Sequence, residues 1–149
     1  MPVSNLSDLL QKAMRENNAV AGVVCLGWED ALAYTRAAEE VGCSLILQAG
    51  PGARQHMPVP VIGPMLNHLA ATANVPVCVH LDHGKEVDEC VEALDYGFTS
   101  LMFDGSALPI EENICLTSKV VEAAKPHNVS VEGEVGFVGY AEGLSLIHI

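Results

Sequence analysis

One regular apolar run of the chain ends in an aspartate and a histidine, two residue types that can take part in catalysis. Residues 77–84 read Val-Cys-Val-His-Leu-Asp-His-Gly. Successive side chains of an extended chain point to opposite faces, so the apolar residues share one face while the cysteine, the first histidine and the aspartate share the other. In parallel α/β proteins catalytic groups gather at the C-terminal ends of strands. Asp82 and His83 are therefore a candidate catalytic pair, and the alternative is a turn in which Asp82 caps the next helix.

Carboxylates also mark two later apolar runs. Glu132 and Glu134 are two residues apart in one run, so they share a face, and Asp104 ends the run before it. We expect these acidic groups to meet at one rim of a sheet. Buried carboxylates without a cation are costly, which favours a metal ion nearby. The alternative is a solvated edge strand whose glutamates bind nothing.

These side chains need a sheet to position them, and the chain has the pattern of one. Apolar runs alternate with segments of helical periodicity, which is typical of repeated βα units and a parallel sheet. The expected strands cover residues 19–26, 43–47, 76–81, 98–103 and 129–135. A first helix near residues 4–16 is expected to cap the bottom of the sheet.

The helix expected after Pro109 has a recognisable apolar stripe. Ile114, Thr117, Val121 and Ala124 recur at helical spacing, which predicts that they face the core. No Ser/Gly linker or charge block interrupts the chain, so nothing indicates a second domain.

Composition fits an enzyme with a buried core and excludes some partners. Hydrophobic residues make up 50% of the chain and charged residues 17%. The net charge is −12 with only 7 Lys and Arg residues, which disfavours nucleic acid and acidic membrane surfaces. The 5 cysteines have no CxxC spacing and are expected to be reduced. Neither a signal peptide nor a membrane span is indicated, and a cytoplasmic location is expected.

The segment His-Leu-Asp-His-Gly at 80–84 resembles the signature of the class II fructose-bisphosphate and tagatose-bisphosphate aldolase family. Further segments match in the family's order, at residues 45–48, 97–106, 111–114 and 129–136. The resemblance runs from about residue 4 to residue 143. It implies an α/β fold, a partial TIM (β/α)₈ barrel of about five βα units with an N-terminal capping helix.

The length of the chain leaves a second architecture open. A whole (β/α)₈ barrel needs about 250 residues, whereas a complete five-stranded, doubly wound domain of the flavodoxin type fits 149 residues. The motifs favour the partial barrel. We expect residues 1–143 to be the N-terminal part of an aldolase-like barrel and residues 144–149, which match nothing in the family, to be an unrelated or artefactual tail.

The resemblance implies a zinc-dependent lyase of carbohydrate metabolism and glycolysis. Such an aldolase cleaves a phosphorylated ketose into dihydroxyacetone phosphate and an aldehyde. His83 would be a metal ligand, and Asp82 would exchange a proton with the substrate hydroxyl. Asp104 and Glu134 would lie at an alternative, more buried metal position, with Glu132 supporting them from outside the ligand set.

Other residues are implied more indirectly. Glu142 matches the loop glutamate that removes the carbon-bound proton. Gln48 and Arg54 follow the second strand and are expected to approach the substrate, Arg54 as a phosphate partner. The pair Val23-Val24 replaces the Phe-Asn of common members, so a substrate other than fructose bisphosphate stays open.

The family's remaining ligands bear on activity. Two further histidine ligands and the phosphate loops would fall after residue 149, and a catalytic zinc needs about three protein ligands. We therefore expect the chain alone to be an inactive fragment of a homo-oligomeric enzyme. The alternative is a non-catalytic domain that binds a partner.

Overall fold

The fold is built on one parallel sheet whose strands follow the order of the sequence. The computed structural model describes residues 3–136. The sheet order is β1-β2-β3-β4-β5. The strands are β1 (Ala21–Val24), β2 (Leu45–Ala49), β3 (Val77–Gly84), β4 (Ser100–Phe103) and β5 (Ser130–Gly133). This sequential order confirms the partial barrel, and it does not fit the doubly wound alternative, which requires a strand order that reverses.

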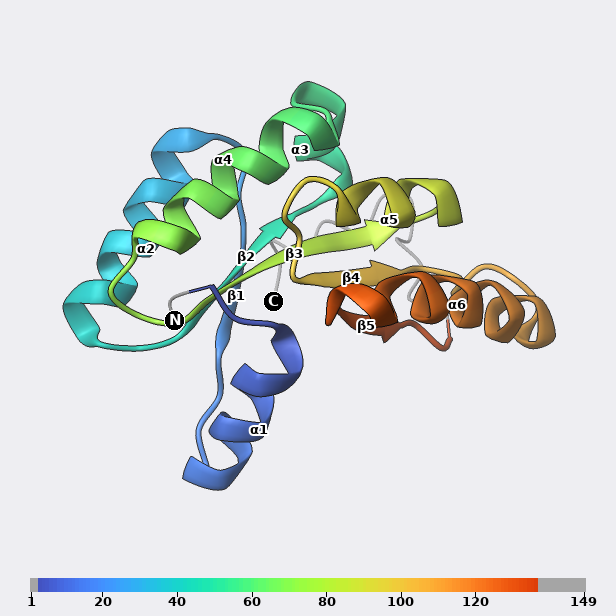
Figure 1. Ribbon diagram of the computed structural model, residues 1–149, viewed down its shortest axis with the longest axis horizontal. Coiled ribbons are helices and arrows are strands. Elements are labelled where there is room, and N and C mark those ends of the chain that lie inside the picture. The colour runs from blue at the N-terminus through green and yellow to red at the C-terminus, as the bar shows by residue number, and fades with distance from the viewer. Residues whose placement is uncertain (1–2, 137–149) are drawn as a thin grey trace, which may run out of the picture.

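One helix, α1 (Leu6–Glu16), precedes β1, and helices also fill the connections between consecutive strands. The connecting helices are α2 (Trp28–Val41), α3 (Pro51–His56), α4 (Val59–Thr72), α5 (Val87–Leu94), α6 (Ile110–Ala124) and the short 3₁₀ helix η1 (Lys125–His127). In Figure 1, α2, α4, α5 and α6 follow one another along the sheet, and each contacts the next. We call the face of the sheet that they cover the outer face. None of these helices combines the length and the apolarity that a bilayer span needs.

Alternation along β2 and β3 separates a core face from a polar face, as the sequence predicts. Residues 45, 47 and 49 of β2 and residues 77, 79 and 81 of β3 are buried in the core with the outer helices. The opposite, inner face carries His80 and Asp82 toward the C-terminal end of β3.

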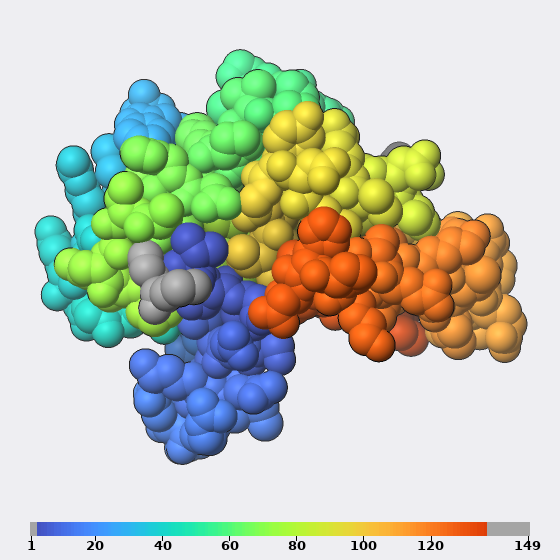
Figure 2. Space-filling model, viewed as in Figure 1, coloured from blue at the N-terminus to red at the C-terminus, as the bar shows by residue number. Residues whose placement is uncertain are grey.

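The N-terminal end of the inner face is closed by α1, as predicted. Leu9 of α1 packs against Ile46 and Cys78, the first inner-face residues of β2 and β3. The segment before α1 adds hydrogen bonds, because the Ser4 amide donates to the Val77 carbonyl at 2.9 Å. Figure 2 shows α1 as a blue lobe that projects from the rest of the molecule. The capping helix therefore lies at the end of the sheet opposite to the candidate site.

The apolar stripe expected on α6 is correct only in part. Ala124 is buried as expected, but Ile114 and Val121 are 55% and 45% exposed, and the other buried residues of the helix are Asn113 and Val120. A buried asparagine needs hydrogen-bond partners, and the Asn113 side chain finds them at the end of β5 and on its own helix. The helix is thereby rotated so that a polar residue faces the sheet.

Candidate metal centre

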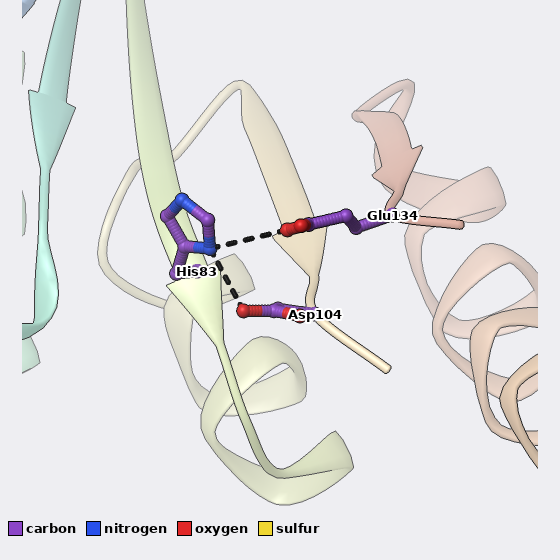
Figure 3. Close-up of side chains that lie close together, drawn as sticks. All are labelled: His83, Asp104 and Glu134. Atoms are coloured by element: carbon purple, nitrogen blue, oxygen red, sulfur yellow. Dashed lines mark hydrogen bonds and ion pairs between the residues drawn. The ribbon is translucent and has the colours of Figure 1, made fainter. Parts of the chain in front are cut away.

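Three predicted site residues converge beyond the C-terminal ends of consecutive strands. His83 is the last residue but one of β3, and Asp104 and Glu134 come directly after β4 and β5. The His83 Nδ1 atom lies 2.8 Å from Asp104 Oδ2 and 3.4 Å from Glu134 Oε2 (Figure 3). One ligand atom from each residue lies within 4.8 Å of the others. We call this group the carboxylate–histidine cluster.

An irregularity at the end of β3 explains how His83 comes to lie on the same side of the sheet as Asp82. Neighbouring side chains of a regular strand point to opposite faces, yet Asp82 and His83 line the same hollow. The β3–β4 register shifts between Leu81 and Gly84, and His83 has a φ of 52°, in the left-handed region. Such a conformation costs on the order of 1–3 kcal/mol in a non-glycine residue. The strained bulge turns both side chains to one side of the sheet.

Asp104 is the most strongly bound carboxylate of the cluster. Its side chain is 4% exposed and pairs with the Lys85 ammonium. The Ser106 amide and hydroxyl donate to Asp104 Oδ1 at 3.1 and 2.5 Å. Burial acts to raise the pKa of Asp104, but the hydrogen bonds from Lys85, Ser106 and His83 outweigh it and hold that pKa well below its usual range. Asp104 is therefore an ionised acceptor at neutral pH.

Glu134 supplies an oxygen that no described residue hydrogen-bonds, because the nearby nitrogen, His83 Nδ1 at 3.4 Å, pairs with Asp104. The Glu134 Oε2 atom is buried and accepts no hydrogen bond from residues 3–136. The position of Glu134 is nevertheless fixed, because Asn113 Nδ2 donates to its backbone carbonyl at 2.8 Å. An unsatisfied buried carboxylate oxygen is costly, and a cation would satisfy it. One imidazole nitrogen and two carboxylate oxygens are a donor set that fits zinc and similar divalent ions.

Beneath the cluster, His80 and Glu132 form a second polar layer on the inner face. His80 is 2% exposed, and its Nδ1 lies 2.9 Å from the Ser100 hydroxyl. Burial lowers the pKa of His80 to about 4 against the opposing effect of the Asp82 carboxylate. The ring is therefore neutral at pH 7, and its 3.7 Å approach to Glu132 Oε2 is not an ion pair. His80 is thus a core histidine that is hydrogen-bonded to Ser100.

The surroundings of Glu132 favour its neutral form more than usual. Burial and the carboxylates of Asp82 and Glu134 raise the pKa of Glu132, while His83 opposes them. Its side chain is still 49% exposed. Glu132 thus lies beside the cluster without belonging to it, and its predicted supporting role stays a prediction.

The cluster opens into a hollow of about 660 Å³. Asp82 and the carboxylate–histidine cluster line one part of it, and Val24 and Leu26 give it an apolar wall. Gly50 lies between these parts, since a Cβ there would be 3.4 Å from both Asp82 Oδ2 and Val24 Cγ1. The hollow is large enough for a small phosphorylated molecule.

Of the two residues expected to approach the substrate, Gln48 lies beside Asp82, whereas Arg54 lies outside the hollow. The Gln48 amide lies 3.5 Å from Asp82 Oδ1, at the limit of a hydrogen bond. The Arg54 side chain is only 6% exposed and pairs with Glu89 at 2.7 Å, and it does not line the hollow. The predicted contact of Arg54 with a substrate phosphate therefore finds no support in its position. Glu142 and residues 144–149 lie outside the described residues.

Two contributors were missed at the sequence level. Lys85 was not assigned a role, although it directly follows the glycine of the site motif. Asn113 falls within the matching segment 111–114 and was given no role of its own, although it lies seven and eleven positions before the buried Val120 and Ala124. A polar residue on a buried stripe was the available signal.

Comparison with known proteins defines the family. The family described as "Fructose-bisphosphate aldolase class-II" matches residues 4–147, so the chain belongs to it. The 6-phospho-5-dehydro-2-deoxy-D-gluconate aldolase of Halalkalibacterium halodurans is 41% identical over 145 residues, which are 95% of this chain and 50% of that protein. The fructose-bisphosphate aldolase of Staphylococcus epidermidis is 38% identical over 147 residues, with coverages of 95% and 51%.

Solved structures agree with this assignment. The YdjI aldolase from Escherichia coli K12 superposes with a TM-score of 0.85 at 30% identity, over 90% of this chain and 51% of that chain. The fructose-bisphosphate aldolase of Campylobacter jejuni, with a TM-score of 0.77 at 24% identity, supports the fold alone. The resemblance seen in the sequence is thus confirmed, and the chain spans about half the length of the curated relatives it matches.

Proposed function

We propose that this chain carries part of the active site of a metal-dependent class II aldolase. The reaction is the reversible retro-aldol cleavage of a phosphorylated ketose into dihydroxyacetone phosphate and an aldehyde. The observation that carries the proposal is Asp82 beside the carboxylate–histidine cluster in one hollow. The names of the two relatives support it, because both are aldolases and both names contain a phosphorylated substrate.

In this proposal His83 is a zinc ligand, and Asp104 and Glu134 hold the alternative, more buried position of the ion. A cation would be stable there because Glu134 Oε2 is buried without a hydrogen bond and because Asp104 is ionised. When bound, the divalent ion would polarise the ketone oxygen and stabilise negative charge that develops on it. Glu132 would support the site from its place beside the cluster.

Asp82 is proposed to handle the proton. A carboxylate can take the proton of the hydroxyl whose deprotonation starts carbon–carbon cleavage, provided that it lies within hydrogen-bond reach. Gly50 leaves room next to this carboxylate, and Gln48 lies at the opposite oxygen. Glu142, outside the described residues, is proposed to remove the carbon-bound proton of the triose phosphate.

The apolar wall bears on the identity of the substrate. Val24 and Leu26 are 46% and 65% exposed beside Asp82 in the hollow, and they offer no hydrogen bond to a sugar hydroxyl. The proposal therefore names a phosphorylated ketose rather than fructose bisphosphate. The cytoplasmic location and the homo-oligomeric state that the family implies belong to the same proposal.

Separating metal binding from proton transfer tests the proposal. We expect the protein expressed from its continuous reading frame to cleave a ketose phosphate, to lose activity with a chelator and to regain it with zinc. His83→Ala should lose bound zinc, whereas Asp82→Ala should keep zinc and lose roughly 10²–10⁴-fold in turnover. Zinc content and the release of dihydroxyacetone phosphate are the measurements.

The controls are two exposed residues of the same types. His56→Ala on α3 and Asp88→Ala on α5 should change neither zinc content nor turnover. Activity that survives complete removal of metal would contradict the proposal. A folded protein that binds no zinc and cleaves no ketose phosphate would support a non-catalytic domain that binds a partner.

A further inference from the structure

Arg54 makes an unusual set of contacts behind the metal centre. It lies on α3, and its guanidinium is buried, which requires paired partners. The Nε atom donates to Glu89 on α5 at 2.7 Å. The Nη1 atom donates to the carbonyls of Ala49 and Asp82, the latter at 2.6 Å. The Nη2 atom donates to the His83 carbonyl at 3.1 Å.

Two of these carbonyls belong to the bulge of β3. Ladder pairing with β4 stops at Leu81 and resumes at Gly84, and residues inserted in a bulge are left unpaired by the ladder. The carbonyls of Asp82 and His83 are the acceptors between those points, and both accept from Arg54. The side chain of Arg54 thus replaces hydrogen bonds that the sheet cannot supply there.

The far side of the bulge is closely packed. A Cβ on Gly84 would lie 2.7 Å from Cys90 Sγ and 3.0 Å from the Met102 carbonyl, so β3 runs tightly against α5 and β4. The Gly84 carbonyl accepts from the Asp104 amide at 2.8 Å, which joins the bulge to the start of the loop after β4. The bulge is therefore clamped between Arg54 on one side and this packing on the other.

We propose that Arg54 is a positioning residue for the aldolase site. By holding the carbonyls of Asp82 and His83, it maintains the strained bulge that turns both side chains into the hollow, and Glu89 fixes the guanidinium. This inference rests on the proposed function for the roles of Asp82 and His83. It replaces the expected role of Arg54 as a phosphate partner.

The geometry requires a guanidinium and not merely a positive charge. Three carbonyls and one carboxylate surround the group, and the planar fork of arginine presents five N–H donors at fixed directions. A lysine ammonium is a point charge with three donors, and it cannot reach partners from β2, β3 and α5 together. The conservative variant Arg54→Lys should therefore keep few of the hydrogen bonds that Arg54 makes to these carbonyls and to Glu89.

Local hydrogen exchange, together with zinc affinity, tests the inference. In Arg54→Met we expect the Asp104 amide to exchange several-fold faster while the core amides of β2 keep their rates. The affinity for zinc, measured by competition with a chelator, should fall about 10–100-fold, the usual cost of losing a group that orients metal ligands. Arg54→Lys should resemble Arg54→Met.

Matched variants keep the test decisive. Arg36→Met changes an exposed arginine of α2 and should alter neither measurement. If Arg54→Met fails to fold because Glu89 is left without its partner, the double variant Arg54→Met with Glu89→Gln removes both charges and should show the same local effect.

Several results would overturn the inference. If Arg54→Met has the same Asp104 amide exchange rate and the same zinc affinity as the wild type, Arg54 has no positioning role. The proposed function would then remain intact. Acceleration spread evenly over all strands would mean that Arg54 only adds to global stability. If the wild-type protein binds no zinc, the proposed function fails, and exchange at Asp104 alone decides the role of Arg54.

Discussion

Two histidines at the end of β3 differ sharply in their surroundings although they are close in sequence. His80 is almost fully buried and accepts or donates to Ser100, whereas His83 is 42% exposed and lies between two carboxylates. Burial disfavours the charged form of an imidazole and keeps His80 neutral. The same residue type therefore serves as a neutral core group at one position and as a candidate ligand three positions later.

The depressed pKa of His80 predicts a pH-dependent stability. The folded chain binds this proton only below about pH 4, whereas the unfolded value is 6.5. Between these values the unfolded state binds more protons, so the free energy of unfolding falls as the pH falls through this window. The loss should total about 3 kcal/mol. Denaturant unfolding between pH 7 and pH 4 measures it.

A substitution isolates this contribution from other titrating groups. His80→Asn should flatten the pH dependence by that amount, whatever it does to stability at pH 7. His127→Asn changes an exposed histidine and should leave the slope as it is. Equal slopes for wild type and His80→Asn would contradict the charge state described for His80.

The sequence predicted some features of residues 77–84 and not others. The motif at 77–84 predicted Asp82 and His83 as a candidate pair and the alternation before them. It could not predict the bulge, because the bulge depends on hydrogen bonds from Arg54, a residue of another element. A regular strand would have separated the two side chains.

At the level of elements, α6 fixes the position of Glu134, which directly follows β5. Asn113 is 5% exposed. Its amide donates to the Glu134 carbonyl at 2.8 Å, and its oxygen accepts from the Thr117 hydroxyl at 2.9 Å. The strand positions and their alternation were predicted from the sequence, but this rotation of α6 was not. Periodicity counts apolar residues and gives no weight to a polar one that finds buried partners.

Removing the Asn113 side chain should loosen the junction of α6 and β5. We expect Asn113→Ala to lower the free energy of unfolding by roughly 1–3 kcal/mol, because the Glu134 carbonyl loses its donor. Thr117→Val removes only a donor to Asn113 and should cost less, about 0.5–1.5 kcal/mol. Urea unfolding of both variants measures the difference. A larger loss from Thr117→Val would contradict the role given to Asn113.

Within residues 3–136, the sheet ends at β1 on one side and at β5 on the other. Resemblance to a barrel family predicted the sequential order of the strands, while periodicity alone left the doubly wound arrangement open. Near the β5 edge, Ile110 and Ile114 of α6 are 49% and 55% exposed, and Val135 is 79% exposed. Together they line an apolar groove of about 400 Å³ beside Gly133. Exposed apolar surface beside a sheet edge favours association.

The 149-residue chain should therefore associate through the groove between α6 and β5. We expect Ile114→Lys to reduce association markedly in light scattering over a concentration series, because a charge would have to be desolvated in the contact. Met14→Lys is the matched control, since Met14 is 80% exposed on α1, at the other end of the sheet. Both variants reduce the net charge of −12 by one unit, so general repulsion changes equally in both. Equal association of the two variants would exclude the groove as the contact, whereas a selective loss in Ile114→Lys would locate association at the β5 edge.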